Sequence, residues 1–304
     1  MVMFLKGTFL RRIRRINSML KLGLCLALVS AWPALSTAQV QFENTTAALG
    51  GPFHIGESWG ASWGSLNDDV YPDLYVSNHG MLNSILRNNG ATSFTDVIQT
   101  ADLDGTTTIS PEQDIHGGAW ADFDNDGDQD LFVTRSSVGA RLYVFENDGD
   151  GQFRERGGSL GIGGIGGGRM PVLFDYTNDG LLDVSVVGNG GNRIFERQNN
   201  NRFEEITADA QIGGQCTGGH GAAVSEFFDD GKLYYLCTSP HGVPETAHDT
   251  STLPFTDAMD KFDRIGTTPD SVLADFNNDL RMDIFGVRGL TRPSGVARVS
   301  SRFI

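Results

Sequence analysis

A nine-residue segment with polar or acidic side chains at its odd positions recurs along this chain, and the recurrence constrains the fold more than any other feature. The clearest copy is Asp122–Asp130, which has a carboxylate at every odd position and a glycine at the sixth. The copies align on their ninth position, and we call them loops one to five: residues 65–73, 122–130, 175–183, 226–234 and 275–283. The steps between successive ninth positions are 57, 53, 51 and 49 residues. A period of about 50 residues is typical of a solenoid, a propeller or another repeat array.

Short apolar runs flank the loops and indicate strands. One run, such as MPVLF, precedes a loop, and a second, such as DVSVV, follows it. A third run comes next, and the fourth begins at a phenylalanine in each repeat: Phe42, Phe94, Phe153, Phe203 and Phe255. Four short strands per repeat, with the acidic loop between the first two, predict an all-β fold, a β-propeller of four-stranded blades.

The loops themselves predict calcium sites. Side chains at the odd positions of a tight loop can turn inward together, and a hard cation that prefers six to eight oxygen ligands fits such a cage. The glycine at the sixth position supplies the left-handed backbone that lets the loop close. The alternative is a solvated acidic run, which the strict alternation and the recurrence disfavour.

The segment from His116 to Val133, which begins His-Gly-Gly-Ala-Trp-Ala-Asp, carries a family resemblance. It resembles the repeats of the FG-GAP/VCBS proteins, propellers related to the integrin α head, and most of all the extracellular bacterial type found beside ASPIC/UnbV domains. The resemblance covers roughly residues 40–304. It implies a ring that usually has seven blades, in which the first, third, fifth and ninth side chains and the seventh carbonyl of each loop hold Ca²⁺.

Carried over residue by residue, the resemblance implies Ca²⁺ ligands in four loops. Loops two, three and five are expected to be complete and loop one partial; Val70 takes the glycine position in loop one and Leu280 in loop five. Loop four has Phe228 and Tyr234 at its third and ninth positions and is not expected to bind. The implied ligands are Asn67, Asp69 and Asp73; Asp122, Asp124, Asp126, Asp128 and Asp130; Asp175, Thr177, Asp179, Leu181 and Asp183; and Asp275, Asn277, Asp279, Arg281 and Asp283.

Residues 1–38 predict a signal peptide that is removed from the mature chain. They carry six basic residues and no acidic one. The apolar run Leu22–Val29 is followed by small residues typical of a signal-peptidase cleavage site, Ser36-Thr37-Ala38. The apolar run is short, and Pro33 follows it, so we expect no stable membrane insertion. The propeller is therefore expected to occupy residues 39–304 of a secreted, periplasmic or cell-surface protein.

The charge of the mature chain argues against a nucleic-acid partner. Removal of residues 1–38 leaves 17 basic and 38 acidic residues, a net charge of −21. Most of the acidic surplus lies in the loops, where Ca²⁺ would neutralise it. A basic footprint for nucleic acid is absent from this composition.

Two further sets of residues have structural interpretations. Trp63 and Trp120 share one repeat position, which predicts that both are core residues of the innermost strand. Cys216 and Cys237 leave three alternatives open: a zinc site with the nearby histidines, a disulfide, or two unpaired buried thiols. The histidines have counterparts in other repeats, which disfavours zinc.

No arrangement of side chains typical of an enzyme rises above background, so we expect a protein without catalytic activity. The favoured function is a Ca²⁺-stiffened binding or adhesion module for an extracellular protein or glycan. The alternatives are the propeller scaffold of a polysaccharide-active enzyme and the front fragment of a larger extracellular protein.

The spacing near the C-terminus predicts an incomplete ring. Phe303 follows Phe255 by 48 residues, where the next phenylalanine strand would begin. In a closed five-bladed ring the strand at Phe42 would complete the last blade, and a further copy of it would have no place. We therefore expect the propeller to be incomplete at the C-terminus and to form part of a seven-bladed ring.

Overall fold

A computed structural model of the chain describes residues 44–51, 57–90, 92–98, 100–101, 114–136, 141–164, 168–188, 191–213, 221–238, 246–262, 270–275, 281–288 and 300–303. The chain divides into two units, Met1–Asn44 and Thr45–Ile304, and every element below belongs to the second unit. Residues 1–38 and Phe42 lie outside the described residues. No helix in the described ranges is long and apolar enough to cross a membrane.

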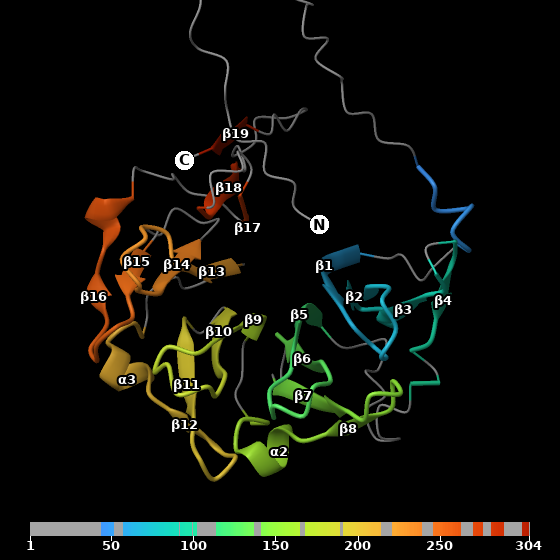
Figure 1. The fold of residues 1–304 in the computed structure, drawn as a ribbon, viewed down its shortest axis with the longest axis horizontal. Helices are drawn as coiled ribbons and strands as arrows, with labels where there is room; N and C mark the ends of the chain where they lie inside the picture. The colour runs from blue at the N-terminus through green and yellow to red at the C-terminus, as the bar shows by residue number, and fades with distance from the viewer. Residues whose placement is uncertain are drawn as a thin grey trace, which may run out of the picture. The chain divides into compact units, whose positions relative to one another are not determined.

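The second unit is built from antiparallel sheets that follow one another along the chain (Figure 1). Blade one consists of β1 (Glu57–Gly64), β2 (Asp73–His79), β3 (Ser84–Asn88) and β4 (Phe94–Asp96). Blade two consists of β5 (Ile115–Ala121), β6 (Asp130–Arg135), β7 (Arg141–Asn147) and β8 (Phe153–Glu155). Blade three consists of β9 (Gly168–Phe174), β10 (Asp183–Gly188), β11 (Arg193–Arg197) and β12 (Phe203–Glu205). Blade four consists of β13 (Gly221–Ser225), β14 (Tyr234–Thr238), β15 (Thr246–Asp249) and β16 (Thr256–Asp257). In blade five the described strands are β17 (Asp270–Ala274), β18 (Asp283–Arg288) and β19 (Ser300–Phe303).

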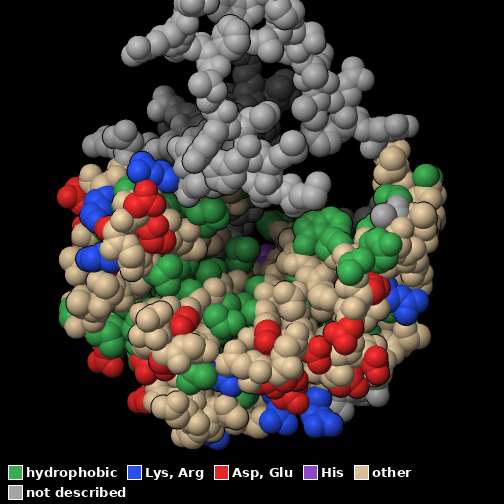
Figure 2. All heavy atoms as spheres, viewed as in Figure 1, with side chains coloured by type: hydrophobic (Ala, Val, Ile, Leu, Met, Phe, Trp, Pro, Cys, Tyr) green, Lys and Arg blue, Asp and Glu red, His purple; other side chains and the backbone are tan. Residues whose placement is uncertain are grey.

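This architecture confirms the predicted all-β fold with propeller blades. Strands are hydrogen-bonded in chain order within each blade, and the first strands of successive blades contact one another. Short helical turns follow the fourth strands: α2 (Gly157–Leu160), α3 (Thr207–Ala210) and η1 (Met259–Lys261). Figure 2 shows hydrophobic side chains near the first strands and charged side chains toward the outer strands. The acidic loop joins the first strand to the second in blades one to four, whose loops are described in full, as the sequence predicts.

The alternation of side chains along the second strands explains how the blades pack. Leu131 and Val133 of β6 pack in one apolar cluster with blade one, whereas Phe132, between them, packs in another with Val184 of blade three. Successive side chains of a strand point to opposite faces of its sheet. A strand buried on both faces therefore reads as a continuous apolar run, and each blade stabilises both of its neighbours.

The prediction that Trp63 belongs to the core is wrong. The register does place the two tryptophans at one repeat position, because Trp63 lies opposite Leu74 and Trp120 opposite Leu131. That position faces the preceding blade: the Trp120 ring covers Gly64, and its Nε1 donates to the carbonyl of Ser62 at 3.2 Å. No described strand precedes β1, and the Trp63 side chain is 60% exposed.

The prediction that Phe303 begins a phenylalanine strand is also wrong. β19 pairs with β18, with Phe303 opposite Phe285, so it takes the third place in its sheet. The reason is the connection between the second and third strands, which spans residues 289–299 here but only residues 80–83 in blade one. Because this connection is longer, Phe303 of the third strand lies 48 residues after Phe255, which is the spacing expected for a phenylalanine of the fourth strand.

Candidate metal-binding loops

The described loops lie side by side at one end of the strands. Asn125 of loop two donates from its Nδ2 to the carbonyl of Gly180 in loop three at 3.2 Å. Arg281 of loop five pairs with Asp229 of loop four, with 2.9 Å between Nη2 and Oδ2. In both pairs, the fourth residue of one loop contacts the next loop, so polar contacts join these neighbouring loops.

The fourth and sixth positions give the loops their tight curvature. In loop two, Asn125 has a φ of 64° and Gly127 a φ of 105°. Loops three and four repeat this pair of left-handed residues at Asn178, Gly180, Asp229 and Gly231. Glycine adopts this backbone without strain, and Asn and Asp tolerate it better than other side chains. Loop one, which has Val70 at the sixth position, contains no residue with positive φ.

The first-position carboxylate closes the loop by accepting backbone hydrogen bonds. Asp122 accepts from the N–H groups of Asp126 and Gly127, both at 3.1 Å. Asp175 accepts from the equivalent N–H groups of loop three, those of Asp179 at 3.2 Å and Gly180 at 2.9 Å. The first residue therefore shapes the loop as well as supplying oxygen atoms to it.

Loop two gathers carboxylates in the way that a calcium site requires. One oxygen each of Asp122, Asp124 and Asp130 lie within 4.8 Å of one another. Oxygens that each lie about 2.4 Å from one Ca²⁺ ion are at most about 4.8 Å apart. The Oδ1 atom of Asp124 is buried without a hydrogen-bond partner. Its pKa is raised, first by burial and then by the charge of Asp126. The donor set, the spacing and the unsatisfied oxygen all fit a hard cation.

The ninth-position aspartate has a structural role that the sequence analysis did not predict. Asp130 is fully buried, and its two oxygens accept from the N–H groups of Phe123 and Asn147, both at 2.9 Å. Asp73 does the same with Leu66 and Asn88, at 2.8 and 2.7 Å. The residue thus ties the loop to the end of the third strand. Each oxygen keeps a second lone pair with which it can bind a cation.

Burial raises the pKa of the ninth-position aspartates. The pKa of Asp130 rises to about 7, and so does that of the equivalent Asp183. Asp183 accepts from the N–H groups of Tyr176 and Arg197 at 3.1 and 2.8 Å. A buried carboxylate whose charge is only partly compensated by two N–H groups is the kind of group that a bound cation stabilises.

Other predicted ligands of loops two and three make hydrogen bonds within their own loop. In loop three, Thr177 donates to Asp175 at 3.3 Å, and the N–H of Leu181 donates to Asp179 at 2.9 Å. The equivalent bond in loop two runs from the N–H of Asp128 to Asp126 at 3.0 Å.

Loop one is described in full and loop five only in part. In loop one, Asn67 Nδ2 donates to Asp69 at 3.0 Å, whereas Asn67 Oδ1 is buried without a hydrogen-bond partner. In loop five, Asn277 and Asp279 lie outside the described residues. Asp275 and Asp283 flank that gap, at the end of β17 and the start of β18. Arg281 is exposed and turned toward loop four.

In loop four a lysine ammonium lies beside a loop carboxylate. The Lys261 ammonium lies 3.0 Å from Asp230 Oδ2 and also contacts the hydroxyl of Tyr234, which itself donates to Asp230 at 2.5 Å. The same ammonium lies over the rings of Tyr234 and Phe228, at 4.6 and 5.2 Å from their centroids. The residues that replace two predicted ligands therefore surround a cation that the protein supplies. The contact of Lys261 with this loop could not be predicted from the sequence, because Lys261 lies in η1, distant in sequence from the loop.

Cys237 is disulfide-bonded in the structure. This finding contradicts the alternative of two unpaired thiols and removes this sulfur from any zinc site. Cys216, His220 and His241 lie outside the described residues, as does Cys25, the third cysteine of the chain.

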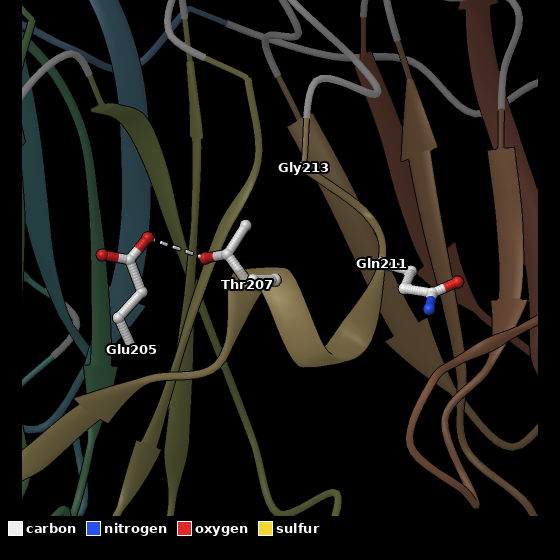
Figure 3. A pocket seen from close by; sticks show the side chains of 5 residues that line it. Glu205, Thr207, Gln211 and Gly213 are labelled. Atoms are coloured by element: carbon white, nitrogen blue, oxygen red, sulfur yellow. Dashed lines mark hydrogen bonds between the residues drawn. The ribbon is translucent and has the colours of Figure 1, made fainter.

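A pocket of about 530 Å³ lies beside α3 and is lined by Glu205, Thr207, Ala208, Gln211 and Gly213 (Figure 3). Its one charged lining group is Glu205, which accepts from Thr207 at 2.9 Å. The same carboxylate pairs with Arg193, with 2.5 Å between Nη2 and Oε2. Because this charge is already neutralised, we assign no chemistry to the pocket.

Comparison with known proteins identifies the repeat. A family model described as FG-GAP-like repeat matches residues 66–133, 122–186 and 175–237, which together exceed half of the chain. Among solved structures, a lectin from Agrocybe aegerita is similar at a TM-score of 0.46 and 15% identity. Its title describes specific recognition of non-reducing terminal N-acetylglucosamine; the match covers 75% of this chain and 60% of the lectin chain. This likeness is too distant to carry an argument. No curated protein matches the chain.

Proposed function

The chain belongs to the family of FG-GAP-like repeat proteins, and from this premise we propose that it is a calcium-binding β-propeller that serves as an extracellular binding module. Its ligand would be a protein or a glycan outside the cell. The single observation that carries the calcium assignment is loop two, where three carboxylates converge and the buried Oδ1 of Asp124 has no partner.

Loop four also supports the calcium assignment, although it is not itself expected to bind the ion. It keeps the left-handed residues of loops two and three at Asp229 and Gly231, yet it lacks two predicted ligands. There Lys261 brings a positive charge to Asp230, which loop four keeps together with Glu226 and Asp229. Ca²⁺ would supply the corresponding positive charge in loops two and three, which keep more of the predicted carboxylates.

Calcium would stiffen one end of the blades rather than take part in a reaction. The first-position and ninth-position carboxylates already hold backbone N–H groups, and an ion would neutralise their remaining charge. Paired acids committed in this way are not free to protonate a leaving group or to attack a substrate, as glycoside hydrolysis requires. We therefore infer a protein without catalytic activity.

The proposed location is secreted, periplasmic or on the cell surface. The first 38 residues have the charge and hydropathy pattern of a signal peptide. The disulfide at Cys237 supports the same location, because disulfides persist mainly in oxidising compartments.

The binding assignment is tested with the chain beginning at Gln39 and a panel of extracellular polysaccharides and surface-protein extracts. Retention on the ligand and release of new reducing ends are measured together, with Ca²⁺ and with a chelator. We expect retention that requires Ca²⁺ and no new reducing ends. Depolymerisation of any polysaccharide would contradict the proposal and favour an enzyme built on the same propeller.

A further inference from the structure

A second cluster of metal-ligating side chains lies outside the acidic loops, between blades one and two. His79 ends β2, and Asp114 and His116 lie at the start of β5. His79 Nε2 lies 3.0 Å from Asp114 Oδ1, and His116 Nε2 lies 2.5 Å from the same oxygen. An isolated β-bridge between His79 and Asp114 holds the two blades in this register. Three ligand atoms from two blades therefore converge on one point.

The cluster is separate from the calcium loops. β2 begins at Asp73 beside loop one, so His79 lies at the other end of that strand. β5 runs toward loop two, which follows Ala121, so His116 is also far from its loop. Whatever binds at this cluster acts on the opposite end of the blades from the loops.

The donor set differs from that of the loops and selects a different cation. Calcium takes oxygen ligands, whereas imidazole with a carboxylate suits zinc and its neighbours among the transition metals. We propose that His79, Asp114 and His116 bind a divalent transition metal ion, with zinc as the reference ion. Three protein ligands leave one coordination position open, which water or an oxygen ligand of a bound partner would occupy.

The distances fit this assignment with small movements. Ligand atoms about 2.0–2.1 Å from a tetrahedral zinc ion lie about 3.3 Å apart. All three candidate ligand atoms lie within 4.8 Å of one another. Rotation of the Asp114 carboxylate away from His116 is the main change required, since their contact is the shortest of the set.

Among the described residues, Trp59 lies against both histidine rings, and His79 is the most exposed member of the cluster. The Trp59 ring lies 5.0 Å from the His116 ring and 6.1 Å from the His79 ring, between centroids. The side chains of His116 and Asp114 are 9% and 23% exposed, whereas that of His79 is 42% exposed. The metal would therefore be reached from the side of His79 and Trp59.

The test is a titration of the untagged mature chain with zinc chloride in saturating Ca²⁺, which keeps the acidic loops occupied. Isothermal titration calorimetry should find one zinc ion per chain that Ca²⁺ does not displace. Titration with Co²⁺ should give the visible absorption bands of a tetrahedral site with nitrogen ligands. Absence of Ca²⁺-resistant zinc binding to the wild-type chain would overturn the proposal.

Two variants assign the site to these residues. Asp114→Asn keeps a hydrogen-bond acceptor but loses the anionic ligand, and His79→Gln changes an exposed side chain. Each should lower zinc affinity by at least about tenfold, the scale at which even outer-shell partners affect metal sites. The matched control is Glu204→Gln, an exposed position on β12 outside both sites, which should leave zinc affinity unchanged. Unchanged zinc affinity in both site variants would assign the ion to other residues and refute the proposal.

Discussion

Asp130 illustrates how a single carboxylate in this protein serves both the fold and a candidate metal site. Its oxygens receive the N–H groups of Phe123 and Asn147, which join the loop to the third strand of the same blade. The exposed Asp126, by contrast, contributes to the loop alone, through the N–H of Asp128. Two ligands of the same chemical type are therefore expected to differ when they are replaced.

We predict that Asp130→Asn destabilises the fold even when no calcium is present. The amide offers one oxygen acceptor, and its NH₂ group would face one of the two backbone N–H groups. An unsatisfied buried donor costs about 1–3 kcal/mol. Urea unfolding in excess chelator should show this loss for Asp130→Asn, and a much smaller loss for the control Asp126→Asn. Equal stability of the two variants would mean that the ninth position acts only through calcium.

At the scale of the element, loops two and four share a backbone shape but differ in what lies beside their carboxylates. Both curve through a left-handed fourth residue and a left-handed glycine. Loop two leaves its carboxylates close together, whereas loop four brings in Lys261 to pair with Asp230. On the proposed function, the two loops differ in which cation neutralises them, Ca²⁺ in loop two and Lys261 in loop four.

This comparison predicts that loop four can be converted into a calcium site. Phe228→Asp and Tyr234→Asp restore the third and ninth ligands, and Lys261→Gln removes the competing ammonium. Native mass spectrometry should find one more Ca²⁺ ion in the triple variant than in the wild type. The matched control keeps Lys261 and carries the two aspartates only; it should bind the extra ion more weakly. No additional ion in the triple variant would contradict the proposed role of Lys261.

Much of each repeat could be predicted from its residues, because strand alternation and loop chemistry are local. The ninth position begins the second strand in all five blades, at Asp73, Asp130, Asp183, Tyr234 and Asp283. The exposure of Trp63 and the place of Phe303 were predicted wrongly, since both depend on what lies beside a strand. Lys261 and the His79–Asp114–His116 cluster were missed for the same reason, because their partners are distant in sequence.

At the scale of the whole unit, the blades depend on their neighbours. The apolar clusters lie between consecutive blades, so that no blade buries its side chains alone. At one end of the blades the loops add a high density of negative charge, and contacts such as Asn125 to Gly180 join one loop to the next. Neutralisation of that charge should therefore stabilise the blades together.

We accordingly predict that a chelator lowers the melting temperature of the mature chain. An ion that binds only the folded state stabilises it by about 2.7 kcal/mol per site at a hundredfold excess over its Kd. At ~2–4 °C per kcal/mol, each site lost should lower the melting temperature by several degrees. Differential scanning calorimetry measures this shift, and excess Mg²⁺ serves as the control for ionic strength. A melting temperature that does not respond to chelation would show that the blades hold without ions.

The measurement that tests the account most directly is the number of Ca²⁺ ions bound per mature chain, together with its change in single-loop variants. Isothermal titration calorimetry should find tight binding in loop two, which has four carboxylates at ligand side-chain positions, and weaker binding in loops three and five, which have three each. Asp126→Ala, Asp179→Ala and Asp279→Ala should each remove one ion, and Asp230→Ala in loop four should remove none. If none of the first three variants reduces the number of bound ions, the acidic loops are not calcium sites.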